Sequence, residues 1–206
     1  MTARGSLVVT RDKWGADESL RFDDVGAETW PRDTDPVRGV VLHHTKTPRG
    51  EADPLARLRA IYAFHAVDRG WGDIGYHLLV DEAGVVYEGR AGSVAVLDGG
   101  PAVIAGHVYG NNPGNVGIAL LGTHFEYAPS AAARSSLVAL MACLCALHGL
   151  DPLDTTSVDG GSLRAHRDLR DTTCPGDAAY ALLPALRAQV AATLRTRPLV
   201  VGATDP

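Results

Sequence analysis

The chain has 206 residues, 46% of them hydrophobic and 21% charged, which excludes a wholly disordered protein and corresponds in length to one domain. The net charge is −5 and the basic residues are scattered, so the sequence lacks the basic stripe of a nucleic-acid-binding protein. No apolar run reaches the roughly 18 residues of a membrane span, and the N-terminal segment has no apolar stretch typical of a secretory signal.

The N-terminal part of the chain predicts an irregular segment followed by one buried strand. Residues 1–35 are polar and irregular, apart from a short apolar stretch and an aromatic anchor at Trp14. A β-branched run over residues 37–42 predicts a buried strand. This strand leads directly into His43 and His44, so both histidines are expected at its carboxyl end.

The middle of the chain predicts one helix and four further strands. Apolar residues recur every three or four positions over residues 54–67, which predicts an amphipathic helix. Residues 75–80 and 85–87 predict a hairpin around a glycine-containing turn. Residues 103–108 and 116–121 predict two more strands around a loop rich in glycine, asparagine and proline.

The second half of the chain is mainly helical. Residues 130–148 predict a helix that begins at a serine cap and ends at a glycine. Residues 151–175 read as a loop with a polar cluster, and residues 177–194 predict a final helix. Strands interleaved with helices predict an α/β fold, a single domain with one central sheet flanked by helices.

The three cysteines of the chain have different surroundings. Cys143 and Cys145 lie in an apolar helical pattern and read as small core residues. Cys174 lies instead in a polar loop, next to Pro175, at the mouth of a predicted helix. A helix N-terminus favours negative charge, so this cysteine is well placed to be a thiolate.

A histidine in the same loop, His166, gives Cys174 a possible partner. A thiolate and a neutral imidazole are a natural pair of zinc ligands, and His43 or His44 at a strand end would supply a third. Two other interpretations stay open from the spacing alone. One is a metal-free nucleophile pair of Cys174 and His166. The other is a buried thiol near a loop histidine, with no chemical role.

Five segments of the chain together carry a more specific signal. They are TRDKWGA at 10–16, VVLHHT at 40–45, GWGDIGYHLLVDEAGVVYEGR at 70–90, AGHVYGNNPGNVGIALLG at 105–122 and AHRDLRDTTCPG at 165–176. In this order and spacing they resemble the type 2 N-acetylmuramoyl-L-alanine amidases and, within that superfamily, the peptidoglycan recognition proteins. The family fold is a mixed central sheet flanked by helices. We place the amidase domain at residues 8–195, with an N-terminal extension at 1–7 and a C-terminal tail at 196–206.

The resemblance implies a catalytic zinc site. Its ligands would be His43, His166 and Cys174, which hold one zinc ion; His44 would then lie on the opposite face of the strand. Tyr76 matches the tyrosine that these enzymes place beside the metal, and Thr172 matches a polar position two residues before the cysteine. Zinc lowers the pKa of bound water to about 7 and polarises the amide carbonyl, while Tyr76 and Thr172 would stabilise the oxyanion.

The resemblance also points to substrate-binding positions. His107 matches a groove-lining position and Asn112 lies in the same loop, where it also reads as a turn residue. Arg90 is a candidate for binding a carboxylate of the substrate, the alternative being a solvated arginine after a hairpin. Some relatives carry an acidic residue where this chain has Ala119, so no general base is expected there. The acidic side chain nearest in sequence on the hairpin, Glu88, is expected to be solvated.

The sequence thus predicts a zinc amidase that cleaves the bond between N-acetylmuramic acid and L-Ala of peptidoglycan stem peptides. The alternative is a non-catalytic muropeptide-binding module on the same fold, and a third hypothesis is an interaction protein on an amidase scaffold. The expected partner is peptidoglycan or muropeptides, with no nucleic acid, no membrane span and a monomeric state. We expect a secreted or wall-associated protein. Animal recognition proteins usually carry a disulfide just after the HT motif; its absence here suggests a bacterial or phage member.

Overall fold

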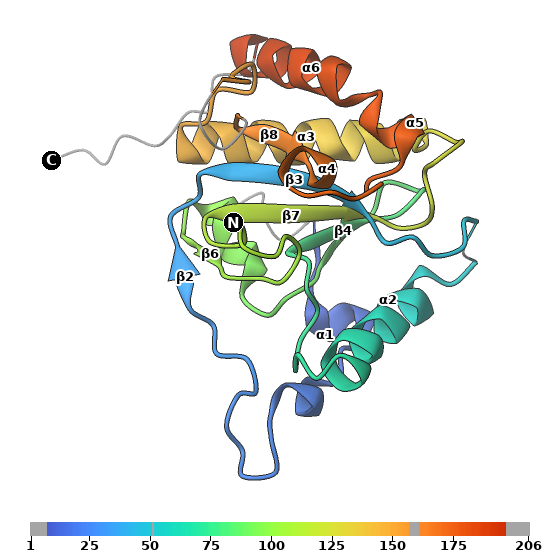
Figure 1. Cartoon of the computed structure of the whole chain (residues 1–206), viewed down its shortest axis with the longest axis vertical. Coiled ribbons are helices and arrows are strands. Elements are labelled where there is room, and N and C mark those ends of the chain that lie inside the picture. Colours follow the sequence, from blue (N-terminus) through green and yellow to red (C-terminus); the bar gives the residue numbers. More distant parts are fainter. Residues whose placement is uncertain (1–7, 51, 157–160, 197–206) are drawn as a thin grey trace, which may run out of the picture.

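The computed structural model describes residues 8–50, 52–156 and 161–196 and is built on a six-stranded mixed sheet (Figure 1). The strand order is β1-β5-β4-β7-β3-β8. The strands are β1 (Val8–Val9), β3 (Gly39–His44), β4 (Leu78–Val80), β5 (Val86–Glu88), β7 (Asn115–Leu120) and β8 (Leu163–Ala165). Within this sheet, as far as the described residues show it, β4 and β5 pair antiparallel and every other pair is parallel. The predicted α/β fold with a mixed central sheet flanked by helices is confirmed.

The two central strands, β3 and β7, are buried along their whole length. They pair in parallel over six residues, with His43 opposite Ala119 and His44 opposite Leu120. Strand β8 pairs with the other edge of β3, also in parallel. Because the carboxyl ends of parallel neighbours meet at one edge of a sheet, residues that follow β3 and β8 lie close together.

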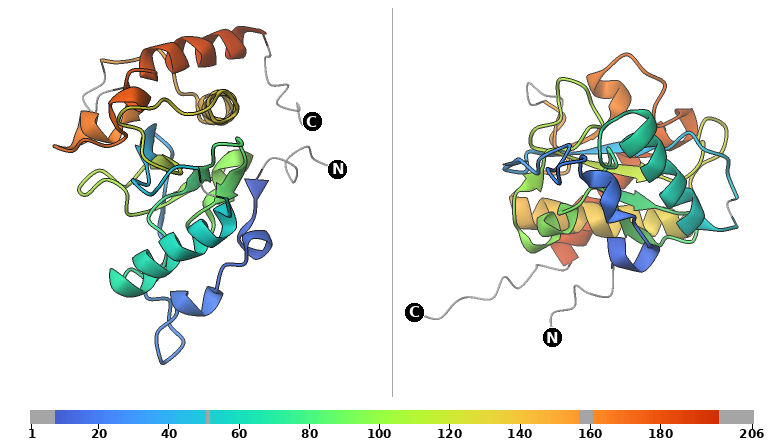
Figure 2. Two further views of the ribbon diagram at one scale, coloured as in Figure 1. Left: turned by 90° about the vertical axis from the view of Figure 1, so that its right-hand side faces the viewer. Right: turned by 90° about the horizontal axis from the view of Figure 1, so that it is seen from below.

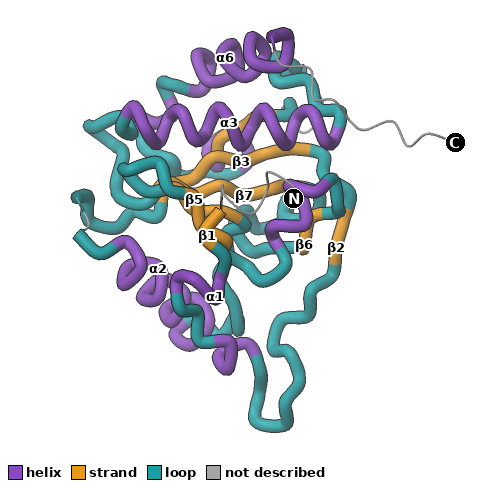
Figure 3. Tube along the Cα trace, turned by 180° about the vertical axis from the view of Figure 1, so that it is seen from behind, coloured by secondary structure: helices purple, strands orange, loops and turns teal. Residues whose placement is uncertain are grey.

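Helices cover both faces of the sheet and explain why its central strands are apolar on both sides. On one face lie α3 (Ala131–His148) and α6 (Leu183–Thr196), and on the other lie α1 (Arg11–Trp14) and α2 (Pro54–Ala63). Figure 2 shows these layers edge-on, and Figure 3 shows the same order from behind. Each side has its own hydrophobic cluster.

The longest helix, α3, has the boundaries that its capping residues predict. The Ser130 hydroxyl accepts a hydrogen bond from the Ala133 amide at 3.0 Å, and Gly149 ends the helix in the left-handed conformation. By length and composition alone α3 is apolar enough to cross a membrane. Its buried residues belong to the cluster shared with the sheet and α6, which is the position of a core helix.

One predicted strand and one predicted loop are wrong in their extent. Of residues 103–108 only Val103 is in a strand, β6 (Ala102–Val103), which pairs with β2 (Thr34–Asp35) in a separate two-stranded sheet. Beyond Ile104, whose amide donates to the Asp33 carbonyl, the chain forms a turn in which the His107 amide donates to the Asn112 side chain. Residues 151–175 are not only loop, since they contain β8 and the short helix α4 (His166–Leu169). Strand β8 has three residues, too few for an alternating pattern.

Two predicted helices also differ in detail. The helix over residues 54–67 begins at Pro54 as expected but continues beyond α2 as a π-helical turn at Phe64–Asp68. The predicted final helix is two helices, α5 (Asp177–Tyr180) and α6. Pro184 lies in the first turn of α6, where its missing N–H costs least, so a continuous helix through this position is disfavoured. The predicted extension at 1–7 and, apart from Thr196, the predicted tail lie outside the described residues.

Buried histidines make the stability of the fold depend on pH. His77 directly precedes β4 and is fully buried. Its imidazole donates to the Val103 carbonyl and accepts from the Gly117 amide. Burial lowers the pKa of His77 from 6.5 to about 4. The unfolded histidine therefore binds a proton at a higher pH than the folded one, and stability is lost as the pH falls from 6.5 towards 4.

We expect the His77→Gln variant, which keeps one donor and one acceptor, to lose less stability in acid than the wild type. Between about pH 7 and pH 5 the difference should be about 2 kcal/mol. Urea unfolding followed by circular dichroism at both pH values measures it. Equal losses in the two proteins would contradict a neutral buried His77.

Candidate active site

Three side chains that could bind a metal ion converge at the carboxyl edge of the sheet. His43 lies near the end of β3, His166 directly follows β8, and Cys174 lies in the loop after α4. One ligand atom from each residue lies within 4.8 Å of those of the other two. The parallel pairing of β3 and β8 therefore brings together residues that are 131 positions apart, His43 and Cys174.

Hydrogen bonds hold the segment that carries His166 and Cys174. The Arg167 amide donates to the Cys174 carbonyl at 3.1 Å, which closes the loop. The Cys174 amide donates to the Thr172 hydroxyl at 3.3 Å. The Cys174 sulfur accepts from the His44 amide at 3.4 Å, so the thiol is anchored to β3 itself.

The geometry and the chemistry of these donors fit a zinc ion. Zinc bonds of about 2.3 Å to sulfur and about 2.1 Å to nitrogen, at a tetrahedral angle, separate two such donors by about 3.6 Å. The Cys174 sulfur lies 3.7 Å from Nδ1 of His43. Burial lowers the pKa of His43 and of His166, so both imidazoles are neutral as ligands must be. Burial raises the pKa of the Cys174 thiol to about 11, and a bound cation would favour its thiolate.

A chain of hydrogen bonds fixes which nitrogen of His43 faces the cluster. Nε2 of His107 lies 3.0 Å from the Asn115 carbonyl, an acceptor, so it must carry a proton. Nδ1 of His107 then accepts from Nε2 of His43 at 2.9 Å. Nδ1 of His43 is consequently unprotonated and turns its lone pair towards Cys174, as a metal ligand requires.

His107 lies so close to β7 that only glycine fits beneath its ring. A Cβ atom at Gly117 would come within 2.6 Å of the imidazole. The Asn112 side chain accepts from the amides of His107 and Val108 at 2.9 and 2.7 Å, so it shapes the turn that carries this histidine. Asn112 also borders the adjoining cavity, but its carbonyl oxygen is engaged by the backbone, in agreement with the turn interpretation.

His44 occupies the other face of β3, as the alternation of a strand requires. Its Nδ1 accepts from the His124 amide at 3.2 Å and its ring packs edge-on against Phe125. Within the described part of the chain, the metal-ligand cluster contains neither His44 nor His107. A closed structural zinc site needs a fourth protein ligand. These two histidines do not provide one.

Tyr76 and Thr172, the two predicted oxyanion donors, border the cluster. The Tyr76 ring lies 5.4 Å from the His43 ring, centroid to centroid. Burial raises the pKa of Tyr76, so the phenol keeps its proton, and among the described residues its hydroxyl has no hydrogen-bond partner. The Thr172 hydroxyl accepts the Cys174 amide and therefore retains its own proton for donation. Both groups can donate to a ligand.

A cavity of about 610 Å³ adjoins the cluster on the side of His166. Aromatic rings of Trp30, Trp71 and Tyr109 line it, together with polar side chains. The lining residues are Thr29, Trp30, Gly70, Trp71, Gly106, His107, Tyr109, Asn112, His166, Arg170, Asp171 and Thr172. A largely apolar cavity with a few polar groups is the usual form of a site for an organic ligand.

Arg90 does not lie where the sequence suggested. Its side chain is fully buried, so it is neither solvated nor exposed to a substrate carboxylate in the cavity. It donates to the carbonyls of Trp30 and Pro31 at 3.1 and 2.9 Å. Glu88 is buried as well, not solvated, and accepts from the Gly92 amide at 3.2 Å. The hairpin that carries both residues packs under the segment around Trp30, which the sequence pattern did not indicate.

The sequence also gave no role to His65, which supports Tyr76. The π-helical turn after α2 directs Nδ1 of His65 to the Gly75 amide at 3.1 Å. The His65 ring then packs between Trp71 and Tyr76, with centroids 5.0 and 5.7 Å away. The only sequence signal for this residue was its helical spacing, which indicated a core position.

The contact between His107 and His43 leads to a prediction about metal affinity. In the His107→Phe variant Nε2 of His43 loses its acceptor, and both tautomers of His43 become accessible. We expect zinc affinity to fall by about 10- to 100-fold. Competition with a chelating dye measures it. The His107→Gln variant, which can still accept from His43, should retain most of the affinity.

A matched control for this prediction is His148→Phe. His148 also bonds a backbone carbonyl, that of Val96, but lies at the end of α3 away from the cluster. Its replacement should leave zinc affinity unchanged. Unchanged affinity in the His107→Phe protein would show that His107 does not orient His43.

The fold and the site together define a class of protein: an α/β protein with a candidate metal site of two histidines and one cysteine beside a ligand-sized cavity. Residues 33–177 match the family model described as N-acetylmuramoyl-L-alanine amidase. The chain belongs to this family. The resemblance proposed from the sequence motifs is therefore confirmed, whereas a bacterial or phage origin stays a prediction.

Curated relatives carry two names. The chain is 31% identical over 181 residues to peptidoglycan recognition protein 1 of Bos taurus, covering 85% of this chain and 82% of the relative. It is 31% identical over 158 residues to the N-acetylmuramoyl-L-alanine amidase of Homo sapiens, covering 72% of this chain but 24% of that longer protein. The family therefore includes relatives named for recognition and relatives named for the amidase activity.

Solved structures agree with the fold over most of the chain. Peptidoglycan recognition protein-LE in complex with tracheal cytotoxin, a monomeric diaminopimelic acid-type peptidoglycan, superposes with a TM-score of 0.67 at 27% identity. The match covers 87% of this chain and 94% of that one. Drosophila PGRP-LB superposes with a TM-score of 0.63 at 28% identity, covering 84% and 90%.

Proposed function

We propose that the protein is a zinc-dependent amidase that cleaves the bond between N-acetylmuramic acid and L-Ala of peptidoglycan stem peptides. The observation that carries this proposal is the cluster of His43, His166 and Cys174, with its donors spaced for zinc and a ligand-sized cavity beside it. Three protein ligands leave one coordination position for water or substrate, as catalytic zinc sites do. Membership in the amidase family supports the same activity.

The reaction needs help because an amide carbonyl is a poor electrophile. When bound, zinc supplies a water molecule with a pKa of about 7 and polarisation of the carbonyl. The Tyr76 hydroxyl, protonated at neutral pH, donates a hydrogen bond to the oxygen that becomes negatively charged in the transition state. The hydroxyl of Thr172, two residues before Cys174, offers a second hydrogen-bond donor. Such preorganised donors favour the transition state over the ground state.

The chain offers no carboxylate from β7 to act as a general base. The residue opposite His43 in the sheet is Ala119, and it is fully buried. Glu88 lies on the hairpin and is occupied by the Gly92 amide. The proposed mechanism needs no carboxylate base, because water on a bound zinc ion would lose its proton near neutral pH, while Tyr76 acts only as a hydrogen-bond donor.

The second candidate function is a non-catalytic muropeptide-binding module. A solved relative that shares the fold is in complex with tracheal cytotoxin, so the fold accommodates peptidoglycan fragments. A module that only binds muropeptides needs no complete set of metal ligands. This chain retains His43, His166 and Cys174, which favours the enzyme. A role as an interaction protein has no supporting feature among the described residues.

We further propose the setting in which the enzyme acts. Its partner is peptidoglycan or soluble muropeptides, its amidase domain extends over residues 8–195, and it works as a monomer. The substrate is a cell-wall polymer, so the place of action is outside the cytoplasm. The partner and the place of action follow from the substrate class, and the bounds of the domain follow from the extent of the sequence motifs.

The test is release of free stem peptide from purified muropeptides, followed by liquid chromatography. We expect release by the zinc-loaded protein, none after chelation, and recovery when zinc is returned. Release that is unaffected by thorough chelation would contradict the zinc mechanism. No release by protein that has bound one zinc ion would contradict the enzyme and favour the binding module.

A further inference from the structure

The aromatic wall of the cavity next to His166 is built more rigidly than an ordinary surface. Trp30 and Trp71 meet edge to face, with ring centroids 6.2 Å apart. Both are half-buried, so part of each ring faces the cavity that also contains His166 and Thr172. Trp30 comes from the long segment between the 3-10 helix Glu18–Arg21 and β2.

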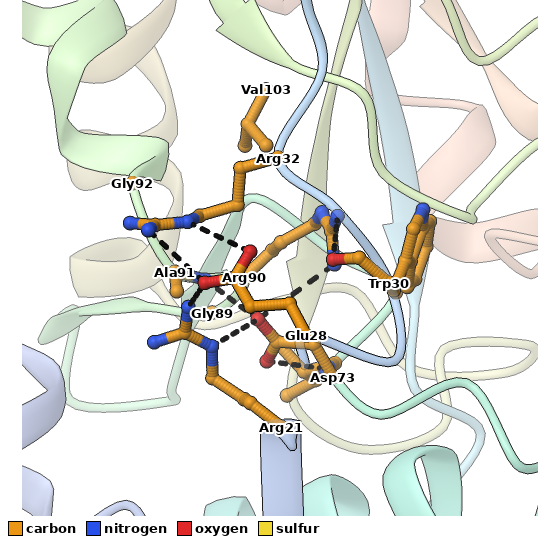
Figure 4. A network of polar contacts seen from close by, with 12 residues as sticks. Arg21, Glu28, Trp30, Arg32, Asp73, Gly89, Arg90, Ala91, Gly92 and Val103 are labelled. Carbon is orange, nitrogen blue, oxygen red and sulfur yellow. Dashed lines mark hydrogen bonds and ion pairs between the residues drawn. The ribbon is translucent and has the colours of Figure 1, made fainter. Parts of the chain in front are cut away.

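Arg90 holds Trp30 in place from below. Its guanidinium carbon lies 3.6 Å from the centroid of the Trp30 ring, and its Nη2 donates to the carbonyls of Trp30 and Pro31. Figure 4 shows Arg90 between this segment and Asp73, whose carboxylate lies 3.8 Å from Nη1 of Arg90. Burial lowers the pKa of Arg90 to about 10, which leaves it charged at neutral pH. Arg90 therefore covers one face of the indole, and part of the Trp30 side chain lines the cavity.

The network around Asp73 fixes Arg90 in turn. Asp73 is buried and accepts from Arg11 at 2.9 Å and from the Ala91 amide at 3.0 Å. Glu28, which precedes Trp30 by two residues, pairs with Arg21 and with Arg32, the latter at 3.0 Å. Charged groups thus tie the segment that carries Trp30 to the 3-10 helix through Arg21 and to the hairpin through Arg90 (Figure 4).

Glycines allow the wall to pack this closely. A Cβ atom at Gly106 would lie 2.7 Å from the Trp30 ring, and one at Gly75 would lie 2.9 Å from the Trp71 ring. Gly72, which has a φ of +74°, leaves room for Thr29 in the same way. Two chain segments, at Gly106 and at Gly75, therefore approach the two indoles without a side chain between them.

From this construction we infer that Trp30 binds the sugar of the substrate, by stacking the part of its ring that lines the cavity on the pyranose ring of the muramic acid. This inference rests on the proposed function and deepens it. A pyranose has a flat face of C–H groups and a rim of hydroxyls, which suits a fixed indole with polar groups beside it. Arg170, Asp171 and Asn112 provide such polar groups in the same lining.

The peptide side of the substrate suits this wall less well. A stem peptide offers alanine methyl groups, amides and carboxylates, none of which presents a flat apolar face to an indole. The sugar and the peptide flank the scissile amide on opposite sides, so a cavity that adjoins the metal ligands on one side takes one of them. Arg90 touches no substrate and acts as a positioning residue, since it removes the freedom of the Trp30 ring before binding.

The experiment compares two substrates that share the scissile amide and the stem peptide. One is an N-acetylmuramoyl tripeptide, and the other is a D-lactoyl tripeptide, which lacks the pyranose. We expect Trp30→Ala to raise KM for the muramoyl substrate about tenfold, or about 1.4 kcal/mol, and to leave the lactoyl substrate unchanged. Trp30→Phe should recover most of the loss. Arg90→Lys, which loses the two carbonyl contacts, should shift KM in the same direction for the muramoyl substrate alone.

The matched control is Phe22→Ala. Phe22 lies in the same segment and also packs against an arginine, Arg21 at 5.3 Å, but it does not line the cavity. It should change neither substrate. Equal effects of Trp30→Ala on both substrates, or no effect on either, would overturn the inference while the amidase function stands. If the wild type cleaves neither substrate, the amidase function fails, and calorimetric affinities of the same two compounds for the same variants decide the inference separately.

Discussion

Replacement of Cys174 by alanine is expected to abolish both zinc binding and the release of stem peptide. The thiol lies 3.7 Å from Nδ1 of His43, and its loss leaves two histidines, which hold zinc weakly. Without the metal, water must react with its ordinary pKa near 16 instead of about 7, so the rate should fall at least about a thousandfold. Metal analysis of the purified variant and the stem-peptide assay measure the two losses.

The chain supplies its own control for this prediction. Cys145 is a buried thiol in α3, and burial raises its pKa to about 12. Cys145→Ala removes a cysteine without touching the cluster and should keep one zinc ion and full activity, at a modest cost in stability. Activity of the Cys174→Ala protein near the wild-type level would eliminate Cys174 as a ligand and with it the proposed mechanism.

Replacement of Tyr76 by phenylalanine is expected to reduce kcat while leaving zinc content and KM nearly unchanged. The change removes one hydroxyl that has no protein partner among the described residues and that remains protonated at neutral pH. Loss of one oxyanion donor costs about 100- to 1,000-fold in kcat. Steady-state kinetics on a muramoyl tripeptide, with the metal content measured on the same sample, test it.

Tyr62 provides the comparison for this hydroxyl. It is a buried tyrosine whose hydroxyl also lacks a partner, but it packs edge to face on Trp14, in the cluster between the sheet and α2. Tyr62→Phe should leave kcat unchanged. A Tyr76→Phe enzyme whose kcat equals that of the wild type would show that the oxyanion is stabilised by other groups, Thr172 first among them.

Local patterns predicted the central elements well because each carries its own signal. The β-branched run before His43 became β3, and the Ser130 cap and Gly149 bounded α3 as expected. Strand β8 was not predicted, because three residues containing a buried arginine, Arg164, show no periodicity. It forms only because the edge of β3 is available for pairing, which is a property of the sheet rather than of residues 163–165.

In the candidate site, too, the sequence motifs identified individual residues but not the contacts that depend on the fold. Motif resemblance named His43, His166 and Cys174, and the fold brings these three side chains together. It could not show that His107 contacts His43, because that contact joins two chain segments 64 residues apart. Arg90 was proposed to bind a substrate carboxylate through paired hydrogen bonds, with a solvated arginine after the hairpin as the alternative, and both interpretations assumed an accessible side chain. Its burial depends on the segment around Trp30, whose irregular sequence gave no sign that it crosses the hairpin.

The short pairing of β8 with β3 couples the folding of this edge strand to metal binding at the cluster of His43, His166 and Cys174. Strand β8 pairs with β3 at three positions, whereas β3 and β7 pair at six. An edge strand with so few contacts can detach while the rest of the sheet stays folded. Because the Arg167 amide joins its loop to Cys174, detachment would remove His166 and Cys174 together and leave His43 behind. Metal binding and the docking of residues 163–174 are then one coupled equilibrium, in which each strengthens the other by the same factor.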